Sequence, residues 1–194
     1  MANNAFQYGF RWHSNRNGGD TKPQPERVRV ASGYDAAPGG VHCNLQPGDL
    51  VKKVSDGTVE LAVAGDAFYG VIDYIGPYYD SGVGAMVYNN VLPYANGVYV
   101  TNYERESAVF IIPAAGQIFR AMADDASTAT TYAAYRALIG ENADMINDAV
   151  TPSARPLLDI STHETGTRQW RIVDIGREVN IDFTGLYVPI LVTA

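Results

Sequence analysis

From Val28 onward, short apolar runs alternate with turn residues at regular spacing, and this pattern constrains the fold more than any other feature. Strands of sandwiches and barrels are short and are bounded by Gly, Pro, Asn and Asp, whereas helices need longer periodic segments. Glycine occurs 19 times, proline 10 times and tyrosine 13 times, which also favours turns and strands. The sequence therefore predicts a mainly β domain over residues 28–194, built as a small barrel, a β-tulip-like domain or a sandwich.

The clearest unit of this pattern is a hairpin over residues 49–63. Apolar residues at 50, 51 and 54 lead into Asp56 and Gly57, and apolar residues at 59, 61 and 63 return in alternation. An Asp-Gly pair between two such runs is the strongest short-range signal of a β-hairpin. A Pro-Gly-Asp turn at 47–49 precedes this hairpin, and a third strand is predicted around residues 68–72.

Further strands are predicted along the rest of the chain, at residues 86–88, 97–101, 108–112, 170–175, 178–183 and 186–192. Pro189 lies inside the last run. Because proline cannot donate a ladder hydrogen bond, it predicts an edge strand or a bulge there.

One segment has helical rather than β periodicity. Residues 128–139 place Tyr132, Tyr135, Leu138 and Ile139 on one helical face, and Gly140 follows as a C-cap. Residues 142–149 are read as a second short helical turn. We therefore expect a helical insertion at about residues 124–150.

Residues 1–27 are predicted to form an extended N-terminal arm, because they are rich in polar and turn residues. Phe6, Tyr8, Phe10 and Trp12 recur at every second position, so an extended segment places all four on one face. These four residues are the candidate partner-binding site. The stripe either docks as an edge strand on its own domain or docks on another subunit, and the sequence does not separate the two.

Composition limits the classes of partner. Only 18% of residues are charged, against about 25% in ordinary globular proteins, so we expect a partner to cover part of the surface. The net charge is −7, which argues against nucleic acid, because phosphate binding needs clustered Lys and Arg. No apolar stretch approaches the length of a membrane span and no signal-peptide layout is present, so we expect no membrane partner and synthesis in a cytoplasm.

Residues with catalytic potential lack the expected motifs. The histidines and the lone cysteine are His13, His42, His163 and Cys43. His42 and Cys43 are sequence neighbours, and neighbours in a strand point to opposite faces. Ser161, His163 and Glu164 lie in the stretch STHETGT, which we read as an exposed loop rather than a triad. We therefore predict no enzymatic activity, no cofactor and no metal site.

Two residue types point instead to contact surfaces. Seven tyrosines crowd the middle of the chain, at positions 74, 78, 79, 88, 94, 99 and 103. Tyrosine is favoured both at interfaces and on strand faces, so these residues serve an interface, the core or both. Arg168, Arg171 and Arg177 alternate with acidic residues, which predicts salt bridges that set register at an assembly interface.

Two segments resemble a known group of proteins. The stretch CNLQPGDLVKKVSDGTVELAVAGDAFYGVI, residues 43–72, resembles the signature region of tailed-phage head decoration, or capsid cement, proteins. There a P-G-D turn, a short strand, a D-G hairpin and a G-V strand recur. The closing WRIVDIGREVNIDFTGLYVPILV is similar to their C-terminal strand pair.

The resemblance implies a structural virion protein on the outer capsid surface, made in the host cytoplasm. Its partners would be the major capsid protein, at contacts between capsomers, and copies of itself in the homotrimer usual for such proteins. We expect deletion of residues 1–27 to weaken capsid retention while leaving the β domain folded. The alternative is a carbohydrate-binding or tail or vertex appendage module, in which Tyr78 or Tyr79 stacks on sugar rings.

Overall fold

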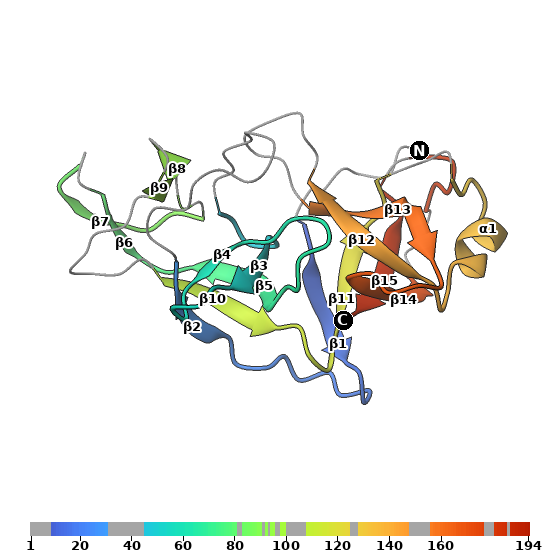
Figure 1. Cartoon of the computed structure of the whole chain (residues 1–194), viewed down its shortest axis with the longest axis horizontal. Coiled ribbons are helices and arrows are strands. Elements are labelled where there is room, and N and C mark those ends of the chain that lie inside the picture. The colour runs from blue at the N-terminus through green and yellow to red at the C-terminus, as the bar shows by residue number, and fades with distance from the viewer. Residues whose placement is uncertain are drawn as a thin grey trace.

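The computed structural model describes residues 9–30, 45–80, 83–90, 92, 94–95, 98–99, 108–124, 128–147, 156–176, 181–185 and 187–194. The fold is mainly β, with two larger antiparallel sheets, two short hairpins and one short helix (Figure 1). Neither larger sheet closes into a barrel, and the arrangement is sandwich-like. The predicted fold class is confirmed.

The larger sheet has six strands in the order β1-β11-β15-β14-β12-β13, and every neighbouring pair is antiparallel. Its strands are β1 (Arg11–Asn15), β11 (Gln117–Met122), β12 (Asn142–Asn147), β13 (Pro156–Glu164), β14 (Trp170–Ile175) and β15 (Pro189–Thr193). The sheet therefore combines the N-terminal segment with the C-terminal half of the chain.

The second sheet has five strands in the order β2-β10-β5-β3-β4, again antiparallel throughout. Its strands are β2 (Glu26–Arg29), β3 (Leu50–Lys53), β4 (Val59–Leu61), β5 (Gly70–Ile75) and β10 (Ala108–Pro113). Two short hairpins, β6 (Tyr78–Asp80) with β7 (Ala85–Val87) and β8 (Tyr94–Ala95) with β9 (Val98–Tyr99), extend from this sheet at one end of the molecule (Figure 1).

Both sheets curl strongly. A single parallel bridge joins Ala123, just after β11, to Leu158 in β13, and another joins Val30, just after β2, to Val59 in β4. Each bridge brings strands from distant parts of one sheet together without a continuous ladder. The curl follows from the right-handed twist that strands accumulate across a sheet.

The five-stranded sheet is buried on both faces at its centre. Successive residues of a strand point to opposite faces, so neighbours in the sequence enter different cores. The core shared with the six-stranded sheet receives Leu50, Val71 and Ile112. The second core receives Val51, Ile72 and Ile111. This explains why these strands read as continuous apolar runs rather than as alternating ones.

The predicted Asp-Gly hairpin is confirmed. β3 and β4 pair with Val51 opposite Leu61, and the turn closes with the Val54 N–H donating to the Thr58 carbonyl at 3.0 Å. Gly57 has φ of +82°, a conformation that glycine adopts without steric cost. β5 then pairs with β3, so the three predicted consecutive strands are adjacent.

The helix is shorter than predicted. α1 spans Tyr132–Ala137, and the Thr131 hydroxyl caps it by accepting the Ala134 N–H at 3.2 Å. The expectation of a second helical turn at 142–149 is wrong for residues 142–147, which form strand β12. Ala143 and Met145 alternate into the core there, which is a β periodicity.

The C-terminal strands follow the prediction in part. β14 has the predicted bounds, but residues 181–183 form no strand, because the Asp182 carboxylate accepts the Thr184 N–H at 2.9 Å and makes a turn. β15 is a central strand, so the edge-strand reading of Pro189 is wrong. Pro189 is the first residue of β15, a position that strands tolerate.

Candidate functional site

The described part of the expected arm belongs to the fold. β1 pairs with β11 and forms an edge of the six-stranded sheet. Phe10 is 1% exposed and Trp12 is half-buried against the same core, so they share one face as their spacing predicts. Phe6 and Tyr8 lie outside the described residues. For Phe10 and Trp12 the structure selects docking on their own domain.

Two contacts fix this segment. The Phe10 N–H donates to the Gly48 carbonyl at 2.9 Å, and the Trp12 Nε1 donates to the Gln117 Oε1 at 2.7 Å. Since Phe10 lies in the core, removing residues 1–27 would damage the fold itself. That deletion therefore does not isolate a role in partner binding.

A second candidate surface is the projecting hairpin β6–β7. Tyr88 is 82% exposed and Val83 69% exposed, and Met86 is also exposed. Tyr78, at the start of the hairpin, is only 2% exposed, so it cannot stack on a ligand as the carbohydrate alternative requires. The side chain of Tyr79 lies outside the described part of the structure. The hairpin therefore buries Tyr78 and exposes Val83, Met86 and Tyr88 to solvent.

The sequence around this hairpin has few charges. Residues 74–103 contain seven tyrosines and one charged residue, Asp80. Charged residues are depleted and tyrosine is enriched at the centres of protein interfaces, because charges lose solvation when they are buried. The composition of this segment therefore suits a surface that a partner covers.

The residues considered for catalysis do not form a triad. The His163 Nδ1 contacts the Glu141 carboxylate, and the Ser161 hydroxyl donates to Asp159 at 2.6 Å. Ser161–Glu164 form the end of β13 rather than the expected loop, and an edge strand accommodates polar residues because it borders solvent. His42 and Cys43 lie outside the described residues.

The structure offers no ready metal site in the part of the chain that it describes. No group of three or more His, Cys, Asp or Glu side chains there could hold a metal ion. Within the same ranges, no helix is both long and apolar enough to cross a membrane.

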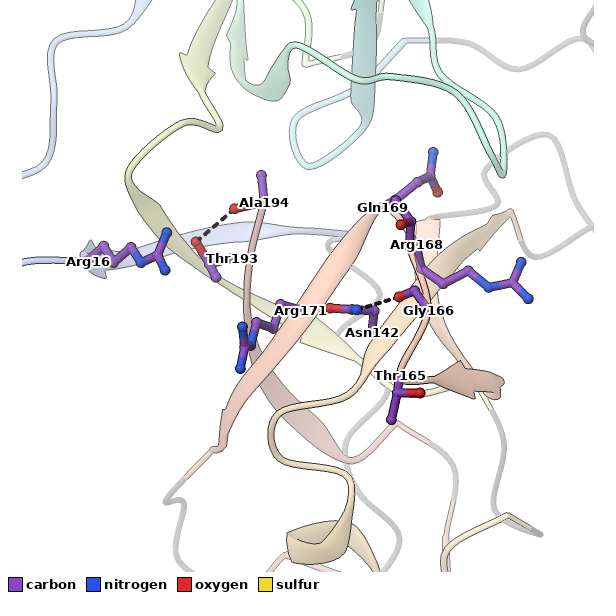
Figure 2. Close-up of a pocket in the computed structure, with 10 residues that line it drawn as sticks. Arg16, Asn142, Thr165, Gly166, Arg168, Gln169, Arg171, Thr193 and Ala194 are labelled. Carbon is purple, nitrogen blue, oxygen red and sulfur yellow. Dashed lines mark hydrogen bonds between the residues drawn. The ribbon is translucent and has the colours of Figure 1, made fainter.

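The arginines near the C-terminus differ from one another. Arg168 donates from Nη1 to Asp144 at 2.9 Å and from Nε to Glu164 at 2.5 Å, so both acids precede the stretch in which the arginines alternate with acidic residues. Arg171 lines a pocket of about 440 Å³ together with Arg16 and Arg168. Figure 2 shows Arg16 and Arg171 beside Thr193 and Ala194 at the end of β15, with Arg168 extending to the opposite side. Arg177 lies outside the described residues.

A further concavity of about 500 Å³ lies where the two sheets meet. Trp12 from β1 and Tyr74 from β5 both line it, although they are distant in the sequence. No sequence motif marks this groove, because its residues come from separate segments. In the sequence, these groove residues are marked only by their alternation with core residues, and that alternation does not show which segments will be neighbours in the fold.

No protein-family model, curated protein or solved structure matches this chain. The functional argument therefore rests on the residues and their geometry.

Proposed function

We propose that this chain is a head decoration protein of a tailed bacteriophage, a non-enzymatic structural component that binds the outer capsid surface. Its partners are the major capsid protein and further copies of itself, as a homotrimer. It is made in the host cytoplasm and resides on the virion. The proposal begins from the resemblance of residues 43–72 and of the C-terminal segment to such proteins.

The observation that carries the proposal is the projecting β6–β7 hairpin. It holds Val83, Met86 and Tyr88 in solvent at one end of the molecule, beyond the five-stranded sheet (Figure 1). Apolar side chains gathered at one exposed place mark contact sites, whereas scattered ones are ordinary. Tyrosine contributes a large contact area with a polar tip at low cost in side-chain entropy.

The action of such a protein needs no reaction chemistry. A protein that binds the expanded capsid lattice, and not its precursor, stabilises the expanded state by mass action. Binding across a junction between capsomers opposes their separation under internal DNA pressure. A rigid β scaffold suits this role, because little conformational entropy is lost when it binds.

The decisive measurement is the copy number of this chain in density-purified particles from its source, by quantitative mass spectrometry against the most abundant shell subunit. We expect a fixed ratio near one to one. A few copies per particle would place the chain at a tail or vertex instead. Absence from particles would overturn the proposal.

A further inference from the structure

The groove between the two sheets has the form of a ligand site. Its volume of about 500 Å³ lies within the range of about 300–1,000 Å³ typical of small-molecule sites, which occur preferentially where structural units meet. The Phe10 N–H to Gly48 carbonyl bond joins the N-terminal segment to the Pro-Gly-Asp turn at its wall, so the groove is built in rather than formed by a loose segment.

Two aromatic side chains present surfaces in this groove. Tyr74 is 42% exposed and stacks on Phe110 at 4.1 Å between ring centroids, so Phe110 supports its ring. Trp12 is half-buried, and its indole N–H is held by Gln117 at 2.7 Å. Both rings are therefore held in position before any ligand binds, which limits the entropy lost on binding.

The polar groups of the groove are nearly balanced in charge. Asp73 forms an ion pair with Lys22 at 2.5 Å, and Asn90 contributes an exposed amide. Arg11 also lines the groove. Lys22 neutralises the charge of Asp73, while the second oxygen of this carboxylate and the Asn90 amide can accept and donate hydrogen bonds to neutral hydroxyls.

We infer that this groove binds a neutral oligosaccharide, with a pyranose ring stacked on Tyr74 or Trp12 and its hydroxyls bonded to Asp73 and Asn90. A pyranose has an apolar C–H face and a rim of hydroxyls, and the groove supplies an apolar ring surface beside polar groups. This function is additional to capsid binding and does not depend on it. It places sugar recognition at Tyr74 and Trp12 rather than at Tyr78, which is buried.

The chain itself offers a specific probe. It has two tryptophans, of which Trp12 lines the groove and Trp170 is fully buried in the core. We would titrate the full chain with lactose, maltotriose, mannotriose and triacetylchitotriose, and follow both tryptophan fluorescence and calorimetric heat. At least one sugar should give a saturable change in both. Trp12→Phe should remove the fluorescence change and keep the heat, because phenylalanine still stacks.

Variants test the position of the site. Tyr74→Ala should weaken binding about ten-fold, the upper effect of losing one aromatic contact. Asn90→Ala should also weaken it, and this exposed position leaves the core intact. Tyr132→Ala, an exposed tyrosine on α1, is the matched control and should bind like the unchanged chain.

Several results would overturn the inference. They are the absence of saturable binding for all four sugars, or binding that neither Tyr74→Ala nor Asn90→Ala weakens. Near-UV circular dichroism of each variant verifies that the aromatic core is intact. These outcomes are independent of particle stoichiometry, so failure of the sugar site and failure of the capsid proposal are distinguishable.

Discussion

Phe10 stacks on Trp170 with ring centroids 4.7 Å apart and ring planes 19° from parallel. Trp170 also stacks on Phe68 at 4.3 Å and meets the edge of Phe119 at 5.7 Å. Phe10 comes from the N-terminal segment and Phe68 from the residues just before β5. Phe119 lies in β11 and Trp170 in β14. This cluster therefore joins the N-terminal segment to both sheets, so the start of the chain contributes to the stability of the whole fold.

The first prediction concerns this cluster. Phe10→Ala should lower the free energy of unfolding by about 3–5 kcal/mol, because it removes a fully buried aromatic ring and leaves a cavity. Urea unfolding followed by tryptophan fluorescence measures the loss. Tyr88→Ala, at an exposed site, should change stability by no more than about 0.5 kcal/mol. Equal effects of the two substitutions would contradict the role of Phe10.

The second prediction concerns the approach of Gly9 to Gly48. Gly9 has φ of +65°, and a Cβ atom there would lie 2.5 Å from the Gly48 carbonyl oxygen. Gly9→Ala should therefore be strongly destabilising. Gly18→Ala is the matched control, because Gly18 has φ of +83° and no atom within 4 Å of an added Cβ. Gly18→Ala should lower the free energy of unfolding by only about 1–2 kcal/mol, which is the cost of a left-handed backbone conformation for a residue with a Cβ atom. Similar losses of stability in the two variants would show that the backbone around Gly48 shifts to accommodate the added Cβ atom.

Much of the β structure could be predicted from sequence, because its signals are local. The Asp56-Gly57 turn and the alternation around it define β3 and β4 without knowledge of the rest of the fold. The spacing of Phe10 and Trp12 likewise predicts, from local sequence alone, that the two side chains share one face. Whether that face docks on its own domain depends on contacts with Trp170, which is distant in sequence, so spacing alone leaves both alternatives open.

β12 is predicted as a helical turn because its residues directly follow the segment with helical spacing and are expected to continue it. Asp144 is nearly buried within the strand, and it is tolerated because its carboxylate accepts bonds from the Arg168 Nη1 at 2.9 Å and the Gln169 N–H at 3.2 Å. Those partners lie more than 20 residues away, so no local pattern shows that a buried acid is compensated. The groove could not be predicted for the same reason, since Trp12 and Tyr74 line one cavity only in the folded chain.

The third prediction follows from this buried acid. Asp144→Ala should destabilise the chain by about 1–3 kcal/mol, because it leaves the Gln169 N–H and the Arg168 Nη1 without their acceptor. Glu164→Ala removes the other, more exposed partner of Arg168 and should cost no more than about 1 kcal/mol. Thermal unfolding of both variants gives the comparison. The opposite ranking would contradict the assignment of Asp144 as the principal partner.

The fourth prediction concerns acid stability. Hydrogen bonds from the Thr58 hydroxyl and the Thr58 N–H lower the pKa of Asp56 below its ordinary value of 3.8. Because the folded state has the lower pKa, this stabilisation is present above the unfolded pKa and is lost as pH falls through the folded one. Asp56→Asn keeps an acceptor oxygen but does not titrate there.

The stability difference between the unchanged chain and Asp56→Asn should therefore shrink as pH falls from about 6 to about 2. Urea midpoints across that range measure it. Thr58→Ala removes the hydroxyl donor and should reduce the pH dependence that Asp56 contributes. A difference between the unchanged chain and Asp56→Asn that stays constant with pH would show that Asp56 has the same pKa in both states.

The last prediction tests the hairpin as the capsid contact. Val83 and Tyr88 are the most exposed large apolar residues on β6–β7, so a Val83→Ser, Tyr88→Ser double variant should remove contact area and leave the fold intact. Loss of about 1–3 kcal/mol of contact energy corresponds to binding about five- to 150-fold weaker. Pelleting with particles that lack this chain measures retention, and Tyr132→Ser, on the exposed face of α1, is the control.

If the double variant and the control are retained like the unchanged chain, the hairpin is not the contact and the capsid-binding surface lies elsewhere. If both substitutions weaken retention equally, exposed tyrosines act without regard to position, which also excludes a specific hairpin site.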